Sequence, residues 1–342
     1  MRITTLVHVI FVIAMAVIPA FAQKQPHDFL KTIGGFSDGD LAKLDAGDVI
    51  TTTLDTHVKN ELALMGAARI EGTIQTFLEV YRDIETFEKA IGTAKMLSEP
   101  PKMADLQGLD FDKGELKSLE HCKLEDCGIK LGDETLKELQ SQIDWSAQNS
   151  HEAVARFLRE RIFDYAKAYQ EGGNASLAVY RNKSKPRFVA KEFAALLEKS
   201  PYLLQYRPKL NAYLLDYPKG TLAGASDFLY WDVINFGPKP TMRLIHVTID
   251  PPEEGTNVAT IISSKQLYYS HYFDTGLELY SLIPDSEQPD KVFYVVALNR
   301  YRTDLGGGLS GKVMRLGATS GTKGAMKNTI AAAQAAVQER SR

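Results

Sequence analysis

The sequence predicts an α+β fold in which a curved antiparallel sheet grips a long C-terminal helix, with a helical insertion interrupting the sheet. Three observations predict it. Two segments of strand composition precede an amphipathic helix near the N-terminus. Alternating apolar and polar residues return in several segments after residue 241, and the chain ends in an Ala-rich amphipathic stretch. Between these parts, residues 100–240 have mostly helical spacing.

Composition places the chain among ordinary globular proteins. It has 342 residues, of which 44% are hydrophobic and 24% charged, and its formal net charge is −3. Such values exclude collagen-like repeats and polytopic membrane proteins. Nucleic acid is not expected as a partner, because its binding needs a strongly basic surface.

The first 22 residues resemble a secretory signal peptide. Arg2 precedes an apolar run, and the small residues Ala20 and Ala22 occupy positions −3 and −1 before a cleavage site at Gln23. A retained N-terminal anchor is the alternative, because the run is nearly long enough to span a bilayer. We expect cleavage after Ala22 and a periplasmic or secreted protein.

Residues 23–99 form the N-terminal strand and helix part. Ser37 is placed to cap a short helix. Residues 48–55 are rich in β-branched side chains and residues 61–70 are apolar, so both are expected to be strands. Apolar residues at helical spacing predict a helix over residues 73–88.

Residues 100–240 are expected to be a helical insertion. Asn149 and Glu152 have capping-box spacing at the start of its longest helix, which Gly172 and Gly173 end. Shorter helices are expected near residues 191–199 and 208–215.

Cys122 and Cys127 are the two cysteines of the chain. In an oxidising compartment an even pair this close favours a local disulfide. Free thiols and a metal site that includes His121 are the alternatives, although a zinc site needs further ligands that the spacing does not supply.

Residues 241–342 are expected to complete the sheet domain. The segments 242–249, 258–273, 277–283 and 291–302 predict an antiparallel meander. A short segment over residues 309–316 and a helix from about residue 321 to 339 follow, with Met326, Ile330, Ala333 and Val337 on one apolar stripe.

The order of strand, helix containing Ile74-Gln-Thr-Phe-Leu, meander and terminal helix resembles the START-like superfamily, also called SRPBCC or helix-grip. Residues 47–90 and 241–340 carry this resemblance. It implies a hydrophobic ligand held between sheet and helix. The chain is also similar to exported bacterial proteins in Cys122-x4-Cys127, Phe228-Leu-Tyr-Trp231 and Ser270-His-Tyr-Phe-Asp274, which implies no particular chemistry.

Residues 265–274 are the first candidate for a ligand-binding segment. On a regular strand Lys265, Tyr269 and His271 share one face, where aromatic and titratable groups mix as they do in pocket walls. A Tyr-rich strand with one face in solvent has the same pattern, so both interpretations stay open.

Asn299, Arg300 and Arg302 end the next strong β segment. Two arginines near a strand end can clamp a carboxylate or phosphate. The alternative is a solvated surface in which Arg302 pairs with Asp304.

No cofactor or metal is expected. Residues 306–312 resemble a phosphate-binding loop, but Val313 stands where a hydroxyl should hold Mg²⁺. Ser310 lacks the residue pattern of a nucleophile elbow, and no paired-histidine zinc motif occurs.

Three functional hypotheses follow. The first is binding of a hydrophobic or amphipathic, lipid-like small molecule in the cavity between sheet and helix, with peripheral membrane contact through Lys312, Arg315, Lys323 and Lys327. The second is an enzyme that uses His271 in that cavity with Tyr269 or Lys265 as partner. The third is an envelope protein that docks another protein through its helical block.

Overall fold

The computed structural model describes residues 26–235, 239–252, 259–305 and 308–341, with side chains from residue 313 onward in the last range. The expected signal peptide therefore lies outside the described residues. In the described part, eight strands form one antiparallel sheet with the order β1-β2-β10-β9-β8-β7-β6-β3. The strands are β1 (Ile50–Leu54), β2 (Glu61–Glu71), β3 (Gly92–Met96), β6 (Ser226–Ile234), β7 (Thr241–Asp250), β8 (Thr260–Tyr269), β9 (Phe273–Pro284) and β10 (Val292–Thr303).

The expected meander is present as β7 to β10, and β2 pairs with its last strand. The sheet also has β3 and β6, which were not predicted as strands. Strand β6 lies in the range assigned to the helical block, and it pairs with β7 over its whole length. Burial on both faces explains the difference, because a strand covered on two sides shows no apolar and polar alternation.

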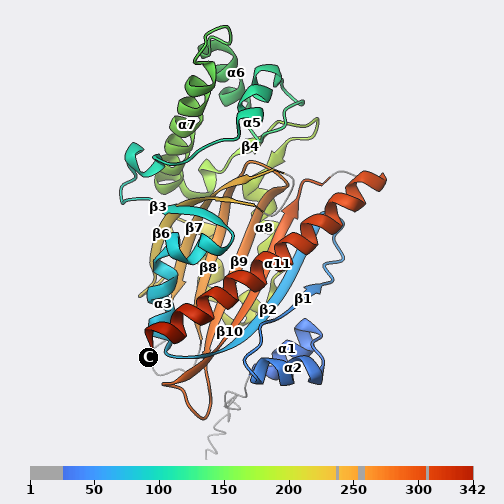
Figure 1. Ribbon diagram of the computed structural model, residues 1–342, viewed down its shortest axis with the longest axis vertical. Coiled ribbons are helices and arrows are strands. Elements are labelled where there is room, and N and C mark those ends of the chain that lie inside the picture. The colour runs from blue at the N-terminus through green and yellow to red at the C-terminus, as the bar shows by residue number, and fades with distance from the viewer. Residues whose placement is uncertain (1–25, 236–238, 253–258, 306–307, 342) are drawn as a thin grey trace, which may run out of the picture.

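Helix α11 (Gly308–Arg340) crosses one face of the sheet diagonally (Figure 1). The predicted stripe of Met326, Ile330, Ala333 and Val337 is buried against that face. Gly66 lets the helix approach β2 closely, because a Cβ there would meet the Met326 sulfur at 2.8 Å. The prediction of two segments was wrong, since a single helix continues through the glycines after residue 316.

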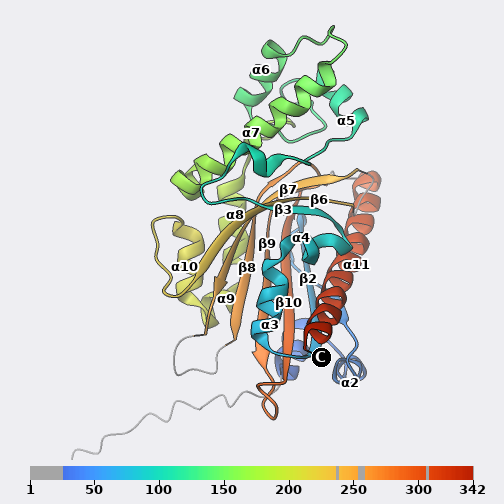
Figure 2. The ribbon, with the colours of Figure 1, turned by 60° about the vertical axis from the view of Figure 1, so that its left-hand side comes forward.

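The molecule has three layers, with helices on both faces of the sheet (Figure 2). We call the face under α11 the inner face, which α3 (Ile74–Arg82) and α4 (Ile84–Phe87) also cover. The opposite, outer face is covered by α1 (His27–Gly34), α2 (Asp38–Asp45), the C-terminal half of α7 (Ser150–Gly172), α8 (Val189–Glu198), α9 (Pro201–Tyr206) and α10 (Pro208–Asp216), together with the short hairpin β4–β5 (Val179–Tyr180 and Arg187–Phe188). Helices α5 (Lys113–Ser118) and α6 (Asp133–Gln142) instead pack with the N-terminal half of α7 in a separate cluster beyond the end of the sheet (Figure 2). The expected α+β class is confirmed.

The predicted helix caps and helix ends are confirmed only in part. Ser37 caps α2 through a capping box, as expected. The expected capping box at Asn149 is wrong, because that side chain makes no capping hydrogen bond to α7. The helix expected over residues 73–88 breaks at Asp83 into α3 and α4.

Among the helices of the described residues, none combines the length and the apolar composition of a membrane-spanning segment.

Candidate functional site

A β-bulge in β8 separates the residues that sequence analysis placed together. Leu244 of β7 pairs with Tyr268, but the next residue, Ile245, pairs with Gln266, so Leu267 is an extra residue. Tyr269 therefore packs in the inner-face core, while Leu267 packs in the outer-face core. The expectation that Lys265, Tyr269 and His271 share one face is wrong.

Lys265 is fully buried on the outer face. Its Nζ donates a hydrogen bond to the Asn174 side-chain oxygen and lies 4.4 Å from the Phe193 ring centre and 5.2 Å from that of Tyr169. Burial lowers the pKa of its ammonium group to about 7. Nearby, Tyr169 and Asp227 both hydrogen-bond His246. These contacts fix α7 to the sheet.

His271 lies neither in the inner-face core with Tyr269 nor beside Lys265. Its two ring nitrogens contact the Glu115 carboxylate of α5 and the backbone oxygen of Gly128. Gly128 follows the predicted disulfide, which is present between Cys122 and Cys127. His271 thus joins the end of β8 to the disulfide loop, away from the inner face where the enzyme hypothesis placed it.

Arg300 and Arg302 point to the outer face and are paired with carboxylates. Glu61 contacts both guanidinium groups, and Glu192 of α8 lies 3.3 Å from the Arg302 Nε. The expected pair of Arg302 with Asp304 is wrong, because Lys130 and Lys183 bind Asp304 instead. The role of Arg300 and Arg302 as an anion clamp stays a prediction.

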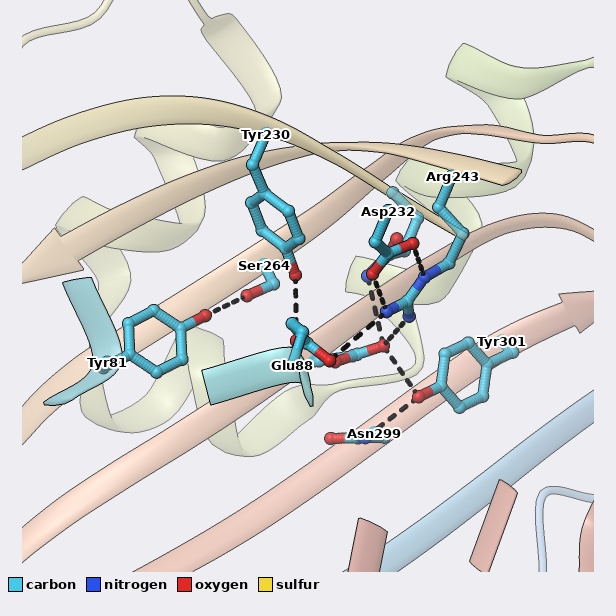
Figure 3. Close-up of polar contacts among 10 residues, drawn as sticks. Tyr81, Glu88, Tyr230, Asp232, Arg243, Ser264, Asn299 and Tyr301 are labelled. Atoms are coloured by element: carbon cyan, nitrogen blue, oxygen red, sulfur yellow. Dashed lines mark hydrogen bonds and ion pairs between the residues drawn. The ribbon is translucent and has the colours of Figure 1, made fainter. Parts of the chain in front are cut away.

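The inner face contains a buried cluster of charged residues that sequence analysis missed (Figure 3). We call Glu88, Asp232, Arg243 and Glu278 the inner charged cluster. The Arg243 guanidinium donates hydrogen bonds to both Asp232 oxygens and, at 3.1 Å, to Glu278, and it lies 3.9 Å from Glu88. The four residues come from η1 (Glu88–Ala90), β6, β7 and β9.

Neutral side chains donate further hydrogen bonds to the cluster. The Tyr301 hydroxyl and the Gln266 amide each donate to Glu278, at 2.9 and 3.1 Å. The Tyr230 hydroxyl donates to Glu88 at 3.3 Å, and the Asn299 amide donates to Tyr301 (Figure 3). Asn299 and Tyr269 are thus the two predicted site residues that face this cluster.

Burial strongly affects the three carboxyl groups. It raises the pKa of Glu88 to about 8, while Arg243 opposes this rise. Burial also raises the pKa of Asp232 and of Glu278.

The enclosed space between the sheet and α11 is small. A cavity of about 40 Å³ lies there, with Glu88, Tyr269, Asn299 and Thr329 among its walls. A lipid-like molecule needs a pocket of several hundred Å³. The expected location of such a ligand under α11 therefore does not fit this structure.

A ligand-sized pocket lies on the outer face instead. We call this space of about 710 Å³ the outer pocket. Met242, Leu244 and Tyr268 of the sheet form its floor, and helix α7 contributes Leu158 and Ile162 to one wall. Loop residues 129–135 and the β4–β5 hairpin form the other walls.

Hydrogen bonds between distant segments hold these walls in place. The Tyr165 hydroxyl of α7 donates to the Leu267 carbonyl oxygen and accepts from the Ala178 backbone. The Tyr268 hydroxyl donates to the Lys130 carbonyl oxygen, and Lys130 itself forms ion pairs with Asp274 and Asp304. The pocket is therefore preformed.

The outer pocket combines apolar walls with a polar rim. Val179 and Phe188 of the hairpin are exposed at its mouth, which presents apolar surface to an entering molecule. Arg161 and Arg181 also line it, and both are half-buried and paired with carboxylates. Such a mixture is typical of sites for amphipathic ligands.

The fold and these cavities define an α+β protein in which an antiparallel sheet packs against a long C-terminal helix and a helical block is inserted over the outer face. No protein-family model matches the chain, and no curated protein has a significant sequence match to it. Among solved structures, the Zhui aromatase/cyclase from Streptomyces sp. R1128 is similar at 11% identity and a TM-score of 0.29, covering 45% of this chain and 87% of that chain. At this level of similarity the match indicates neither activity nor ligand.

Proposed function

We propose that this protein binds an amphipathic small molecule in the outer pocket. The observation that carries the proposal is a preformed space of about 710 Å³ with an apolar floor and wall and an ionic rim. This volume lies within the range of small-molecule sites. The ligand class is the one that sequence analysis expected, but the site is the outer face of the sheet rather than the cavity under α11.

The helical block supports this proposal because it builds most of the pocket. Its helix α7 is held to the sheet through Tyr165, and the loop after the disulfide is held through hydrogen bonds from Lys130 to Ser270 and from Arg181 to Leu131. A disulfide in this loop fits the proposed exported location, because disulfides persist in oxidising compartments.

Fluorescence titration with 11-(dansylamino)undecanoic acid tests the proposal. Ile162 is a half-buried wall residue, so an Ile162→Glu variant places a carboxylate beside the apolar part of the ligand. We expect binding to weaken by about tenfold or more, because burying an unpaired charge is costly.

Ala168→Glu is the matched control, since it adds the same charge to an exposed position of α7 outside the pocket. It should bind the probe like the unmodified protein. Equal binding by all three proteins would contradict the proposal.

A further inference from the structure

The cavity under α11 has walls with several oxygen atoms that lack hydrogen-bond partners in the structure. Three of them are Glu88 Oε2, Asn299 Oδ1 and Thr329 Oγ1. Each of these residues is 4% exposed, and they come from η1, β10 and α11. Three separate elements thus direct hydrogen-bond acceptors at one small space.

The shape and charge of this space favour one chemical group. A volume of about 40 Å³ holds roughly one to three heavy atoms. An ammonium group has three donors and no acceptor, so it matches three oxygens that accept no hydrogen bond, although the Arg243 guanidinium also lies 3.9 Å from Glu88 Oε2. The inner charged cluster supplies more carboxylates than cations, and the rings of Tyr280 and Tyr301 also line the cavity, where they attract a cation.

A surface cleft beside the cavity has room for the rest of such a molecule. A surface cleft of about 700 Å³ runs between α11 and the edge strand β3. Ile91, Ile234 and Ala325 line both the cleft and the inner cavity, so the two spaces adjoin at these side chains. On α11, Gly324 faces the cleft, and a Cβ there would meet no other atom.

We propose that the inner cavity is a second binding site, separate from the outer pocket, which takes the ammonium head of a small primary amine whose body lies in the cleft beside α11. Glu88, Asn299 and Thr329 accept its three hydrogen bonds. Arg243 already binds Asp232 and Glu278 through hydrogen bonds. Glu88 is therefore the residue of the inner charged cluster whose carboxyl oxygen faces the head group.

Methyl NMR of the whole protein with labelled isoleucine δ1-methyl groups tests this proposal. The probe is n-butylamine, and n-butanol is the matched neutral compound of the same length. We expect n-butylamine to shift the Ile91 and Ile234 signals in a saturable manner, and n-butanol to leave them nearly unchanged. Equal shifts with both compounds, or none with the amine, would overturn the proposal.

Two pairs of variants locate the site. Gly324→Leu fills the cleft and should abolish the amine response, whereas Gly317→Leu changes the same helix outside the cleft and should retain it. Above pH 8, where the Glu88 side chain is ionised, Glu88→Gln should weaken amine binding about tenfold, because it replaces a charge-assisted hydrogen bond by a neutral one. Thr329→Val, which removes a neutral acceptor, should weaken it less. A Gly324→Leu protein that binds n-butylamine as tightly as Gly317→Leu would contradict the assignment.

Discussion

The inner and outer faces of the same sheet differ in how they use buried space. Under α11, a large apolar core surrounds one arginine and three carboxyl groups, and this packing leaves an enclosed cavity of only about 40 Å³. Under the helical block, apolar side chains line a pocket of about 710 Å³. In this protein the space between the sheet and α11 is therefore a closely packed core, and the inserted helices build a ligand-sized pocket on the opposite face.

The largest expected effect comes from removing the cation of the inner face. Arg243→Met leaves Asp232 and Glu278 buried without their guanidinium partner. We expect the free energy of unfolding to fall by about 3–5 kcal/mol, as measured by urea denaturation. On the outer face, Arg161→Met breaks half-exposed ion pairs and should cost at most about 1 kcal/mol. Equal losses in the two variants would remove the distinction between the faces.

On the outer face, burial of the Lys265 ammonium group should lower the stability of the folded protein. Its pKa in the folded protein is about 7, below the ordinary 10.5, so between these pH values the unfolded chain binds a proton that the folded chain releases. Stability therefore rises with pH through this window. Lys265→Met should flatten that rise and add roughly 1–4 kcal/mol at pH 7, which thermal unfolding as a function of pH measures. A variant with the slope of the unmodified protein would contradict this.

Glu88 should give the opposite pH dependence on the inner face. Its pKa is about 8 in the folded protein and 4.5 ordinarily, so the folded chain binds the extra proton between these values. Stability from this group is complete below pH 4.5 and is lost as the pH rises toward 8. Glu88→Gln should be more stable than the unmodified protein at pH 8.5 by roughly 1–3 kcal/mol. Parallel stability curves for the two proteins from pH 5 to 8.5 would show that Glu88 does not titrate in this way.

The disulfide should have the smallest effect. The two cysteines are five residues apart, so their bond closes a short loop. Replacing both by alanine should cost about 1–2 kcal/mol. Because this loop leads into the pocket wall at Ile129–Leu131, binding of the dansyl probe should weaken more than the stability change alone explains. Unchanged probe binding would show that the loop does not need its disulfide to shape the pocket.

The sequence predicted the architecture better than the site. Apolar stripes and β-branched segments indicated α11, β2 and the meander, because each has an amphipathic or apolar pattern of its own. The bulge at Leu267 has no such signal, and it alone moves Tyr269 to the opposite face from Lys265. A one-residue insertion in the pairing decides which face every later side chain joins.

The inner charged cluster did leave a trace in the sequence that was not used. Arg243 stands between Met242 and Leu244, and Glu278 stands between Leu277 and Leu279. A single charge between apolar neighbours within a strand indicates a buried partner when both faces of the sheet are covered. Identifying the partners still required the strand order, since Glu88 and Asp232 are distant in the chain.

Native mass spectrometry of protein purified without detergent is the most direct test of the proposed function. We predict a noncovalently bound amphipathic molecule on the unmodified protein and on Ala168→Glu, identified by organic extraction, and its loss from Ile162→Glu. A protein that carries no such molecule and does not bind 11-(dansylamino)undecanoic acid in titration would contradict the assignment of the outer pocket as a ligand site.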